Sequence, residues 1–128
     1  MTSKPPSILV VGSSNTDMVV KTAHLPGPGQ TVLGGTFFMN TGGKGANQAV
    51  AAARLGSNVT FVAKLGNDIF GSQAFAHLEK EGIDCRHIHT DPSAASGVAL
   101  ITVDQRGENS IVVAPGANAL LSAADIIA

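Results

Sequence analysis

Short apolar runs alternate with longer mixed stretches along the chain, and three of these runs predict buried strands. The first, Ile8–Val11, ends at Gly12 and is continuously apolar, as in strands of a parallel sheet that are covered on both faces. The stretch at 58–64 predicts the next strand, and the stretch at 85–90 predicts a weaker one. We therefore expect three parallel strands in the main layer.

Two of the stretches between these strands predict helices. The first extends over 44–55 and stops at Gly56, because glycine commonly follows the last turn of a helix. The second extends to about Lys80, with Asn67 or Asp68 available to cap its first turn. Another helix begins after Ser122. Strands that alternate with helices over short connections predict an α/β fold, in which helices cover a parallel sheet.

Additional β-rich segments do not fit a minimal β-α-β pattern. They lie at 18–21 and 31–39, on either side of the stretch HLPGPGQ, and at 97–103, which we expect to pair with 110–114 across the turn DQRGEN. We interpret SSNTD, at 13–17, as a polar turn before the first of them. These segments predict a small sheet that stands off the main layer.

The length of the chain bounds this architecture. A chain of 128 residues is about one domain long, but three main strands are fewer than the roughly five or six of a typical open sheet. We therefore predict an incomplete three-layer, Rossmann-like parallel sheet with a protruding β lid at about 18–39 and 97–103. We expect residues 1–128 to be the N-terminal part of a larger domain.

Composition excludes several classes of function. The sequence is 44% hydrophobic and 13% charged, with a net charge of −1, so it carries no basic footprint for nucleic acid. The apolar run near the N-terminus is too short for a signal peptide or a membrane span. The single cysteine, Cys85, cannot form an internal disulfide, which fits a reducing compartment. We expect a cytoplasmic protein that binds neither nucleic acid nor membrane.

The stretch MNTGGKGANQAVAAARLG, at 39–56, places a lysine among glycines where a helix is predicted to begin. It is not a P-loop, because no glycine stands five positions before Gly43 and because Gly45 follows Lys44 where that motif needs Ser or Thr. It is not a dinucleotide fingerprint either, because Gln48 stands where the third glycine belongs and the stretch does not follow the first strand directly.

What remains is a Gly-Gly turn at a helix N-terminus. Lys44 and Asn47 are three residues apart and share one helix face, where backbone amides of the first turn point outward. An ammonium group and an amide that both donates and accepts suit a neutral, hydroxyl-rich ligand. The alternative is an ordinary helix start, in which the glycines permit tight packing on the sheet. The residue types alone leave both interpretations open.

Asn15 and Asp17 follow the first strand and are two residues apart. In extended backbone they project to the same side, and ligands of open α/β sheets bind at the carboxyl ends of the strands. A carboxylate can accept from two vicinal hydroxyls at once, which suits a sugar diol. The alternative is an Asx-type turn, in which both side chains bond to local backbone. Because this pair and the Gly-Gly turn are expected near one sheet edge, together they favour a shared polar site.

These motifs resemble a known family. The string GGKGANQA at 42–49, together with GSSNTD at 12–17, is similar to the carbohydrate kinase family that includes fructokinases and adenosine kinase, and the full GGKGANQA string is specific to its ribokinase branch. The resemblance continues through RLG, GNDIFG, SGVALITVDQRGEN and PGAN, so that it covers nearly the whole chain after Pro6.

The resemblance implies a sugar site. In ribokinase-like enzymes, ATP phosphorylates the primary hydroxyl of ribose, and the Asp that matches Asp17 would be a fixed hydrogen-bond acceptor rather than the catalytic base. The segments at 18–21, 31–39 and 97–103 would form the lid, which closes on the sugar and in the family pairs with a second subunit's lid. By matching position, the substrate-binding residues would be Asn15, Asp17, Gly42, Gly43, Lys44 and Asn47, with Ala99 and Ile101 as an apolar wall.

The resemblance also identifies elements that this sequence does not contain. The family's general base ends an acidic-Thr-x-Gly-Ala-Gly-Asp segment, and no such segment occurs in the 128 residues. The family's nucleotide pocket, its Mg²⁺ environment and its monovalent-cation site belong to the same missing part. A general base alone contributes about 10²–10⁴ in rate. We therefore expect no catalytic residue and no bound ATP or metal in this chain, and no useful kinase activity from it alone.

Two other interpretations stay open: a non-catalytic unit that self-associates or binds carbohydrate, and a kinase of fructose or a nucleoside. A parallel sheet cut midway exposes an unpaired edge and apolar surface, so we also expect a homodimer through the lid, the edge or both.

Cys85, His87 and His89 alternate and would share one face of a strand, where such ligands can bind zinc or copper. No fourth ligand is evident nearby, and we interpret these residues as the exposed face of a weak strand.

Overall fold

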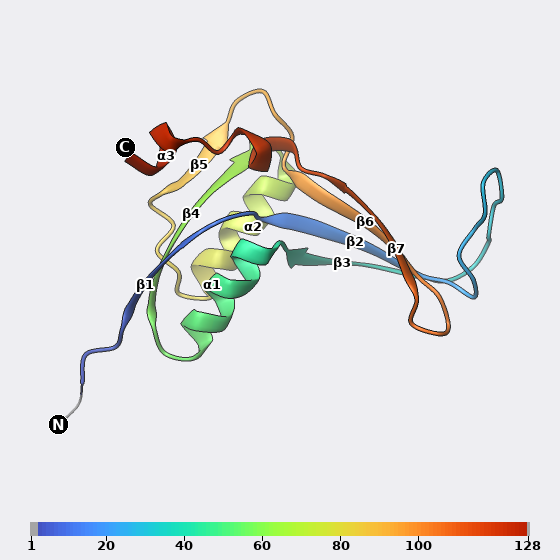
Figure 1. The fold of residues 1–128 in the computed structure, drawn as a ribbon, viewed down its shortest axis with the longest axis horizontal. Coiled ribbons are helices and arrows are strands. Elements are labelled where there is room, and N and C mark those ends of the chain that lie inside the picture. Colours follow the sequence, from blue (N-terminus) through green and yellow to red (C-terminus); the bar gives the residue numbers. More distant parts are fainter. Residues whose placement is uncertain (1–2, 128) are drawn as a thin grey trace.

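The computed structural model describes residues 3–127, and its centre is a parallel three-stranded sheet that we call the base sheet (Figure 1). It consists of β1 (Ser7–Val11), β4 (Asn58–Gly66) and β5 (Ile88–Asp91) in the order β1-β4-β5. The three predicted parallel strands are present, but β1 is not buried as predicted. Only Val10 is buried, whereas Leu9 and Val11 are 62% and 45% exposed, because β1 is an edge strand of the sheet. The third begins later than predicted, because the Ile88 amide donates to the Cys85 carbonyl at 3.1 Å and closes a turn there.

Two helices cover one face of the base sheet, α1 (Lys44–Arg54) and α2 (Ile69–Lys80). Both follow the predicted bounds to within one residue. Gly56 has a φ of +97°, a left-handed value that suits glycine just beyond the end of α1. Asp68 caps α2, since its carboxylate accepts from the Gly71 amide at 2.8 Å. The helices pack on the alternate residues of β4 that face them: Val59, Phe61, Ala63 and Leu65.

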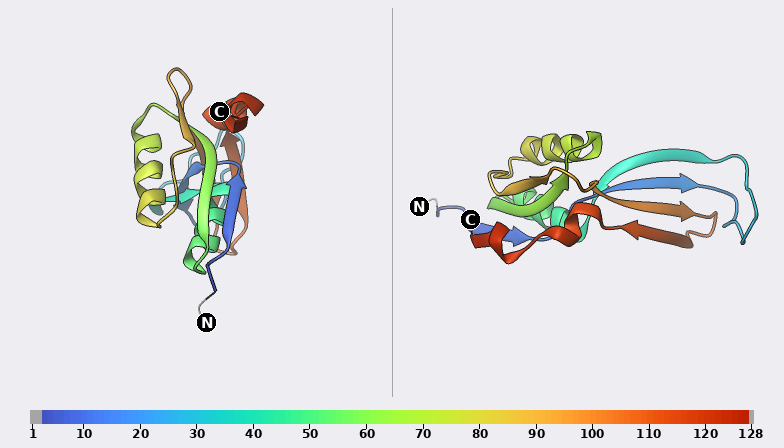
Figure 2. Two further views of the ribbon diagram at one scale, coloured as in Figure 1. Left: turned by 90° about the vertical axis from the view of Figure 1, so that its left-hand side faces the viewer. Right: turned by 90° about the horizontal axis from the view of Figure 1, so that it is seen from above.

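The opposite face of the base sheet is covered in part by the C-terminal segment. This segment contains a short 3-10 helix, η1 (Gly116–Leu120), and α3 (Ala123–Ile127), whose first residue follows Ser122 as predicted. Lys64 projects from β4 toward them: its ammonium group donates to the Leu120 carbonyl at 3.3 Å and pairs with Asp125 at 3.1 Å. Figure 2 shows α2 and this segment on either side of β4, which confirms the three-layer arrangement.

A second sheet protrudes from the base and is antiparallel at both edges (Figure 1). We call it the protruding sheet. Its central pair, β2 and β6, is parallel, and β3 and β7 flank it. The strands are β2 (Asn15–Lys21), β3 (Thr36–Gly42), β6 (Gly97–Val103) and β7 (Asn109–Ala114), in the order β3-β2-β6-β7.

The structure corrects two predictions about this sheet. Asn15, Thr16 and Asp17 belong to β2 and not to a polar turn. The strand predicted at 31–39 lies at Thr36–Gly42 instead, because the preceding Gly34 and Gly35 have positive φ values of 94° and 117°, which no regular strand adopts. The predicted partner of β6 is confirmed and forms the fourth strand of this sheet.

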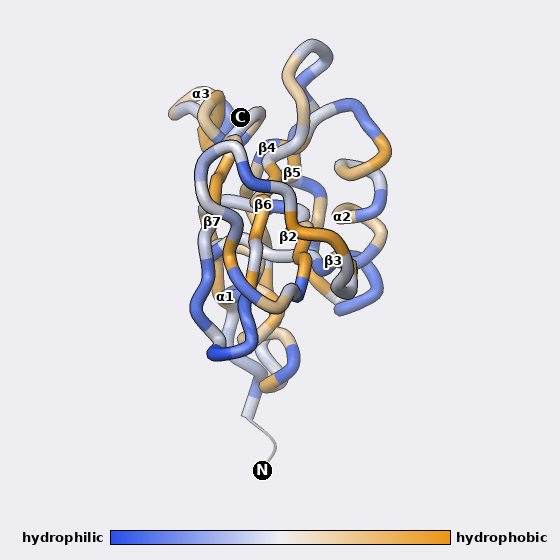
Figure 3. The backbone as a smooth tube through the Cα atoms, turned by 90° about the vertical axis from the view of Figure 1, so that its right-hand side faces the viewer, coloured by the Kyte–Doolittle hydropathy of each residue, from blue (hydrophilic) through white to orange (hydrophobic). Residues whose placement is uncertain are grey.

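The two faces of the protruding sheet differ in exposure, except on the edge strand β7, where every residue is exposed. Residues opposite each other in neighbouring strands share a face, so Asp17 lies on the face of Val19 and Ala99, which are both buried. The other face carries large apolar side chains in contact with solvent. These are Val20, Phe37, Met39, Leu100 and Val112, whose exposed fractions range from 38% to 65%. Figure 3 shows hydrophobic residues along these strands and a hydrophilic turn between β6 and β7.

Within residues 3–127, none of the helices has the length and apolar character needed to cross a bilayer.

Candidate functional site

The predicted polar residues meet where the protruding sheet joins the base. The chain leaves β1 at Gly12, turns through Ser13 and enters β2 at Asn15. In the strand register, Asn15 lies opposite Gly42 on one side and Gly97 on the other. This junction is at the carboxyl end of β1, the edge at which α/β sheets bind ligands. The structure therefore brings the two predicted motifs, one after β1 and one before α1, into contact.

Gly42 lies directly against the Asp17 carboxylate. A Cβ atom at Gly42 would overlap both oxygens of this carboxylate. Glycine at this position therefore makes room for the carboxylate between β2 and β3. Burial raises the pKa of Asp17 above its ordinary value. Within residues 3–127 this carboxylate takes part in no side-chain hydrogen bond or ion pair, and a half-buried acceptor of this kind is typical of a ligand site.

The glycines around Lys44 serve packing as well as conformation. Gly43 caps α1 with a φ of +96°, which favours glycine. A Cβ at Gly45 would lie 2.7 Å from backbone atoms of Gly12 and Ser13, so that only glycine allows α1 to begin against this turn. The alternative interpretation of the Gly-Gly turn therefore holds for Gly45. One of the first-turn amides that were expected to be free for a ligand is also occupied, since the Ala46 amide donates to the Ser13 carbonyl at 2.9 Å.

Lys44 and Asn47 lie on the exposed side of the first turn of α1. In the part of the chain that the structure describes, neither side chain is engaged in a hydrogen bond or an ion pair. Asn47 is bound into the helix through its backbone amide, which donates to the Gly43 carbonyl at 2.8 Å. Both groups are therefore available to a ligand at the N-terminal end of the helix.

Ala99 and Ile101 lie on β6, on the same face as Asp17. Ala99 is directly opposite Asp17 and is 5% exposed, and Ile101 is opposite Val19 and half-buried. The face on which Asp17 lies is thus apolar beyond the polar junction. This arrangement suits the predicted apolar wall, whose contact with a ligand stays a prediction.

Our sequence reasoning did not assign a role to Asn118, which the structure places at the junction. Its amide is bonded to both backbone groups of Ser14 and to the side chain of Asn15, more than 100 residues earlier. The string PGAN, which contains Asn118, contributed to the family resemblance, but no local pattern signals a contact across that separation.

A second connection, between Asp68 and Ser96, joins α2 to the start of β6. The Asp68 carboxylate accepts from the Ser96 amide at 2.8 Å and from its hydroxyl at 2.7 Å, while the hydroxyl accepts from the Gly66 amide at 2.9 Å. Burial alone would raise the pKa of Asp68, but the hydrogen bonds from Ser96, Gly71 and Phe70 outweigh it and hold the pKa below its ordinary value. Asp68 is a helix cap, as the sequence predicts, and it also fixes a strand of the protruding sheet.

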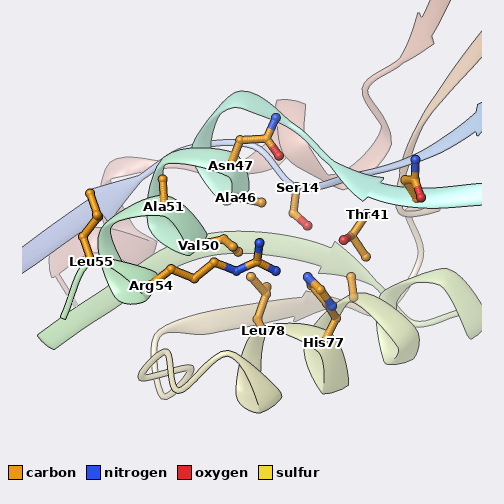
Figure 4. A pocket seen from close by; sticks show the side chains of 12 residues that line it. Ser14, Thr41, Ala46, Asn47, Val50, Ala51, Arg54, Leu55, His77 and Leu78 are labelled. Carbon is orange, nitrogen blue, oxygen red and sulfur yellow. The ribbon is translucent and has the colours of Figure 1, made fainter. Parts of the chain in front are cut away.

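A cavity of about 650 Å³ opens between α1 and α2 (Figure 4). Asn40, Thr41 and Asn47 line one end of it, near the polar junction, and Arg54 lies toward the other. Of the predicted sugar-binding residues, only Asn47 is among its lining residues, and Asp17 and Lys44 lie outside it. The candidate site is therefore the set of polar groups at the junction, because these groups can form hydrogen bonds with a ligand.

The cysteine and histidine residues at 85–89 do not share a strand face. Cys85 and His87 precede β5, and only His89 lies on it. The buried Cys85 thiol donates to the Ile83 carbonyl at 3.3 Å, and burial raises its pKa to about 11. The His89 imidazole is hydrogen-bonded to the Asp125 carbonyl at 2.9 Å. Among residues 3–127, no three His, Cys, Asp or Glu side chains are grouped so that they would hold a metal ion.

A scan against protein-family models matches residues 5–127 to the pfkB family of carbohydrate kinases. This chain belongs to that family. The resemblance in the sequence motifs is thereby confirmed over nearly the whole chain.

Among members of the pfkB family, the chain is 43% identical to a ribokinase from Mus musculus over 120 residues, which are 94% of this chain and 37% of that protein. It is equally similar to a deoxyribokinase from Salmonella typhi, with 43% identity over 93% of this chain and 39% of the relative. The solved structure of an Arabidopsis thaliana ribokinase complexed with ribose and ATP is 33% identical, with a TM-score of 0.76 over 91% of this chain and 38% of that one. The chain thus spans about two fifths of the length of the relatives it matches.

Proposed function

We propose that this chain is the sugar-binding part of a ribokinase, an enzyme that transfers a phosphoryl group from ATP to D-ribose and forms D-ribose 5-phosphate. One observation carries the proposal most directly: the Asp17 carboxylate lies over Gly42, beside Asn15 and close to the start of α1, without a protein partner among the described residues. Family membership and the similar ribokinases support the reaction and its use of ATP.

In this proposal each group of the site has a separate task. Asp17 accepts hydrogen bonds from sugar hydroxyls. This role suits its carboxylate, which in the ionised form accepts hydrogen bonds and cannot donate them. Asn15 and Asn47 add amide contacts, and the Lys44 ammonium donates to a further oxygen. Together these contacts hold the sugar in one orientation relative to the incoming phosphoryl group, which is how positioning lowers the barrier of phosphoryl transfer.

The protruding sheet acts as the lid in this proposal. It begins at the proposed site residues themselves, since Asn15 is the first residue of β2 and Asp17 the third. A lid that closes over the sugar would exclude water, which otherwise competes for the phosphoryl group. The Asp68–Ser96 connection anchors β6 at its base and would hold the junction in place while the outer part of the sheet moves.

We propose that the chain alone does not turn over ATP. The acidic-Thr-x-Gly-Ala-Gly-Asp segment of the family is absent from the sequence, and among the described residues no three His, Cys, Asp or Glu side chains are grouped to hold a metal ion. In the full-length enzyme Mg²⁺ would supply positive charge that offsets the charge of the transferring phosphoryl group. We also propose a cytoplasmic location, which the buried, unpaired Cys85 thiol fits.

Calorimetric titration of D-ribose into the purified chain tests the sugar site. We expect saturable heat from the parent chain and from Glu108→Gln, a change of charge at an exposed turn, and roughly 10-fold or greater weakening in Asp17→Asn, because bonds to a charged group contribute about 1.5–3 kcal/mol. Titrations with 2-deoxy-D-ribose, D-fructose and adenosine show whether ribose is preferred. The absence of heat with every sugar would overturn the proposal.

An ADP-coupled assay with ATP, Mg²⁺, K⁺ and D-ribose tests the predicted lack of turnover.

We further propose that two copies associate through the exposed apolar face of the protruding sheet, defined by Val20, Phe37, Met39, Leu100 and Val112. An apolar patch of this kind on a sheet commonly marks an interface. We expect a dimeric mass at micromolar concentration, and a monomeric mass for Leu100→Lys. Leu33→Lys is the control, because Leu33 is 91% exposed in a loop outside the sheet. A monomeric parent chain would contradict this part of the proposal.

A further inference from the structure

The orientation of the Asn118 side chain is dictated by backbone groups. Its Oδ1 accepts from the Ser14 amide at 2.9 Å, and its Nδ2 donates to the Ser14 carbonyl at 3.1 Å. A backbone N–H can only donate and a backbone C=O can only accept. The two ends of the Asn118 amide therefore cannot exchange places without the loss of both bonds.

Asn118 in turn dictates the orientation of Asn15. The Nδ2 group of Asn118 has a second hydrogen, which it donates to Oδ1 of Asn15 at 2.8 Å. Because Nδ2 of Asn118 can only donate, it selects the oxygen end of the Asn15 amide. Within the described residues, the Nδ2 group of Asn15 has no side-chain or backbone partner. The end of Asn15 that is left for a ligand is thus a donor.

Two neighbouring segments maintain this contact. A Cβ atom at Gly97 would overlap both Asn118 Nδ2 and Asn15 Oδ1, so the first residue of β6 must lack a side chain for the two amides to meet. The Ala117 amide donates to the Ala95 carbonyl at 2.8 Å, which fixes η1 to the segment just before β6. Asn118 is therefore held by the base of the same strand that gives room for its bond to Asn15.

We infer that Asn118 is a positioning residue that turns Asn15 so that its Nδ2 group donates to an oxygen of the sugar, while Asp17 accepts from a sugar hydroxyl. Along β2 the site then presents a donor and, about 7 Å further at the Cα atoms, an acceptor. Such an order recognises a ligand that offers an oxygen acceptor and a hydroxyl donor at opposite ends of one small ring. The identity of the ligand rests on the proposed function, whereas the orientation of Asn15 does not.

The orientation is tested first without any ligand, by NMR of the ¹⁵N-labelled chain. We expect slow solvent exchange for both side-chain amide hydrogens of Asn118, which are bonded to Ser14 and Asn15. Those of Asn15 should exchange as fast as the hydrogens of Asn58, whose residue is exposed at the far end of β4. In Asn118→Asp the side-chain signals of Asn15 should shift and its hydrogens should become protected, since the new carboxylate accepts from them. Fast exchange at Asn118 in the parent chain would overturn the inference.

The consequence for binding is tested by a double-mutant cycle with D-ribose. We expect Asn118→Asp to weaken binding about 10-fold or more in the parent background. In the Asn15→Ala background the same change should weaken binding less than about twofold, because residues that act through one contact are not additive. Asn58→Asp is the matched control and should leave binding unchanged. Gly97→Ala, which separates the two amides, should resemble Asn118→Asp.

The binding affinities of singly deoxygenated riboses distinguish a positioning role of Asn118 from a merely structural one. If Asn118 acts through Asn15, the analogue that lacks the oxygen bound by Asn15 binds the parent chain and Asn118→Asp equally, while the other analogues bind the variant less well. Equal weakening for every analogue, or equal weakening in both Asn15 backgrounds, would overturn the inference. If the parent chain binds none of these sugars, the proposed function fails, and the exchange rates still decide the orientation of Asn15.

Discussion

The central strand of the base, β4, and the strands of the protruding sheet are both rich in apolar residues but bury them very differently. In the base sheet, Phe61 is fully buried between α1 and α2, together with its neighbours on β4. In the protruding sheet, every residue of β7 is exposed, and Phe37 on β3 is 59% exposed. The base therefore supplies the stability of this chain, and the protruding sheet carries apolar surface for other contacts. The site lies at the boundary between them, where polar side chains replace apolar ones.

The largest expected effect is a difference in the free energy of unfolding between substitutions in the two sheets. Phe61→Ala should lower the free energy of unfolding by about 3–5 kcal/mol, because it removes a large side chain from a closed core. Phe37→Ala should lower it by less than about 1 kcal/mol, since this ring is mostly in solvent. Urea denaturation at low protein concentration measures both values. Similar losses at the two positions would mean that the protruding sheet is buried in solution, as in a tight dimer.

An intermediate effect is expected at Asp68, which connects the two regions. Asp68→Ala should lower the free energy of unfolding by about 1–2 kcal/mol at pH 7, since the helix cap and the bonds to Ser96 are lost. The folded-state pKa of Asp68 lies below its ordinary value, so its contribution is present above about pH 4 and is lost as the pH falls through that lowered pKa. Parent and variant should thus converge in acid.

Hydrogen exchange locates this loss. In Asp68→Ala the amides of β6 should exchange faster than in the parent chain, while those of β4 keep their relative protection. A uniform change in both sheets would show that Asp68 stabilises the whole fold and does not specifically fix the protruding sheet.

The smallest expected effect on stability is at Asp17, where binding is expected to change most. Burial raises the folded-state pKa of Asp17, so the ionised carboxylate disfavours the folded state, and stability decreases as the pH rises from about 4 through that raised pKa. Asp17→Asn should therefore unfold at the same urea concentration as the parent chain or a higher one at pH 7, with no difference near pH 3.

Asp84→Asn is the control of opposite sign. Arg86 lowers the pKa of Asp84 to about 2, so its removal should reduce stability at neutral pH. A clear loss of stability in Asp17→Asn at pH 7 would assign the Asp17 carboxylate a structural role.

The base of the fold was predictable because its signals are local. A continuous apolar run marks β1, and the cap at Asp68 and the glycine at 56 mark helix ends to within one residue. The exposure of β1 is not predictable from that run, because it follows from the place of β1 at the edge of the sheet. The protruding sheet was harder to predict. The sequence predicts a turn at Asn15–Asp17, since the polar residues that suit a ligand interrupt the alternation typical of a strand. The strand predicted at 31–39 was displaced because Val32 and Leu33 have high β-propensity, while the following glycines determine where β3 begins.

The site itself was predictable only in part. The motifs that contain Asn15, Asp17 and the Gly-Gly turn pointed to a shared polar edge, and the structure places them together. The sequence leaves open whether the glycines around Lys44 serve packing or a ligand, because the two uses look alike in a sequence, and the close approach of Gly45 to Gly12 is visible only in the structure. Asn118 was missed for a different reason: its effect on Asn15 depends on a contact between distant parts of the chain.

That separation affects when the site can form during synthesis. Asn118 follows Asn15 by 103 residues, so at about 5–20 residues per second the ribosome needs roughly 5–20 s to add the residue that orients Asn15. Throughout that interval β1, β2 and the start of α1 are already available to fold, while Asn15 is free to rotate. A nascent chain can therefore acquire its first strands and its helices before it is able to recognise its ligand.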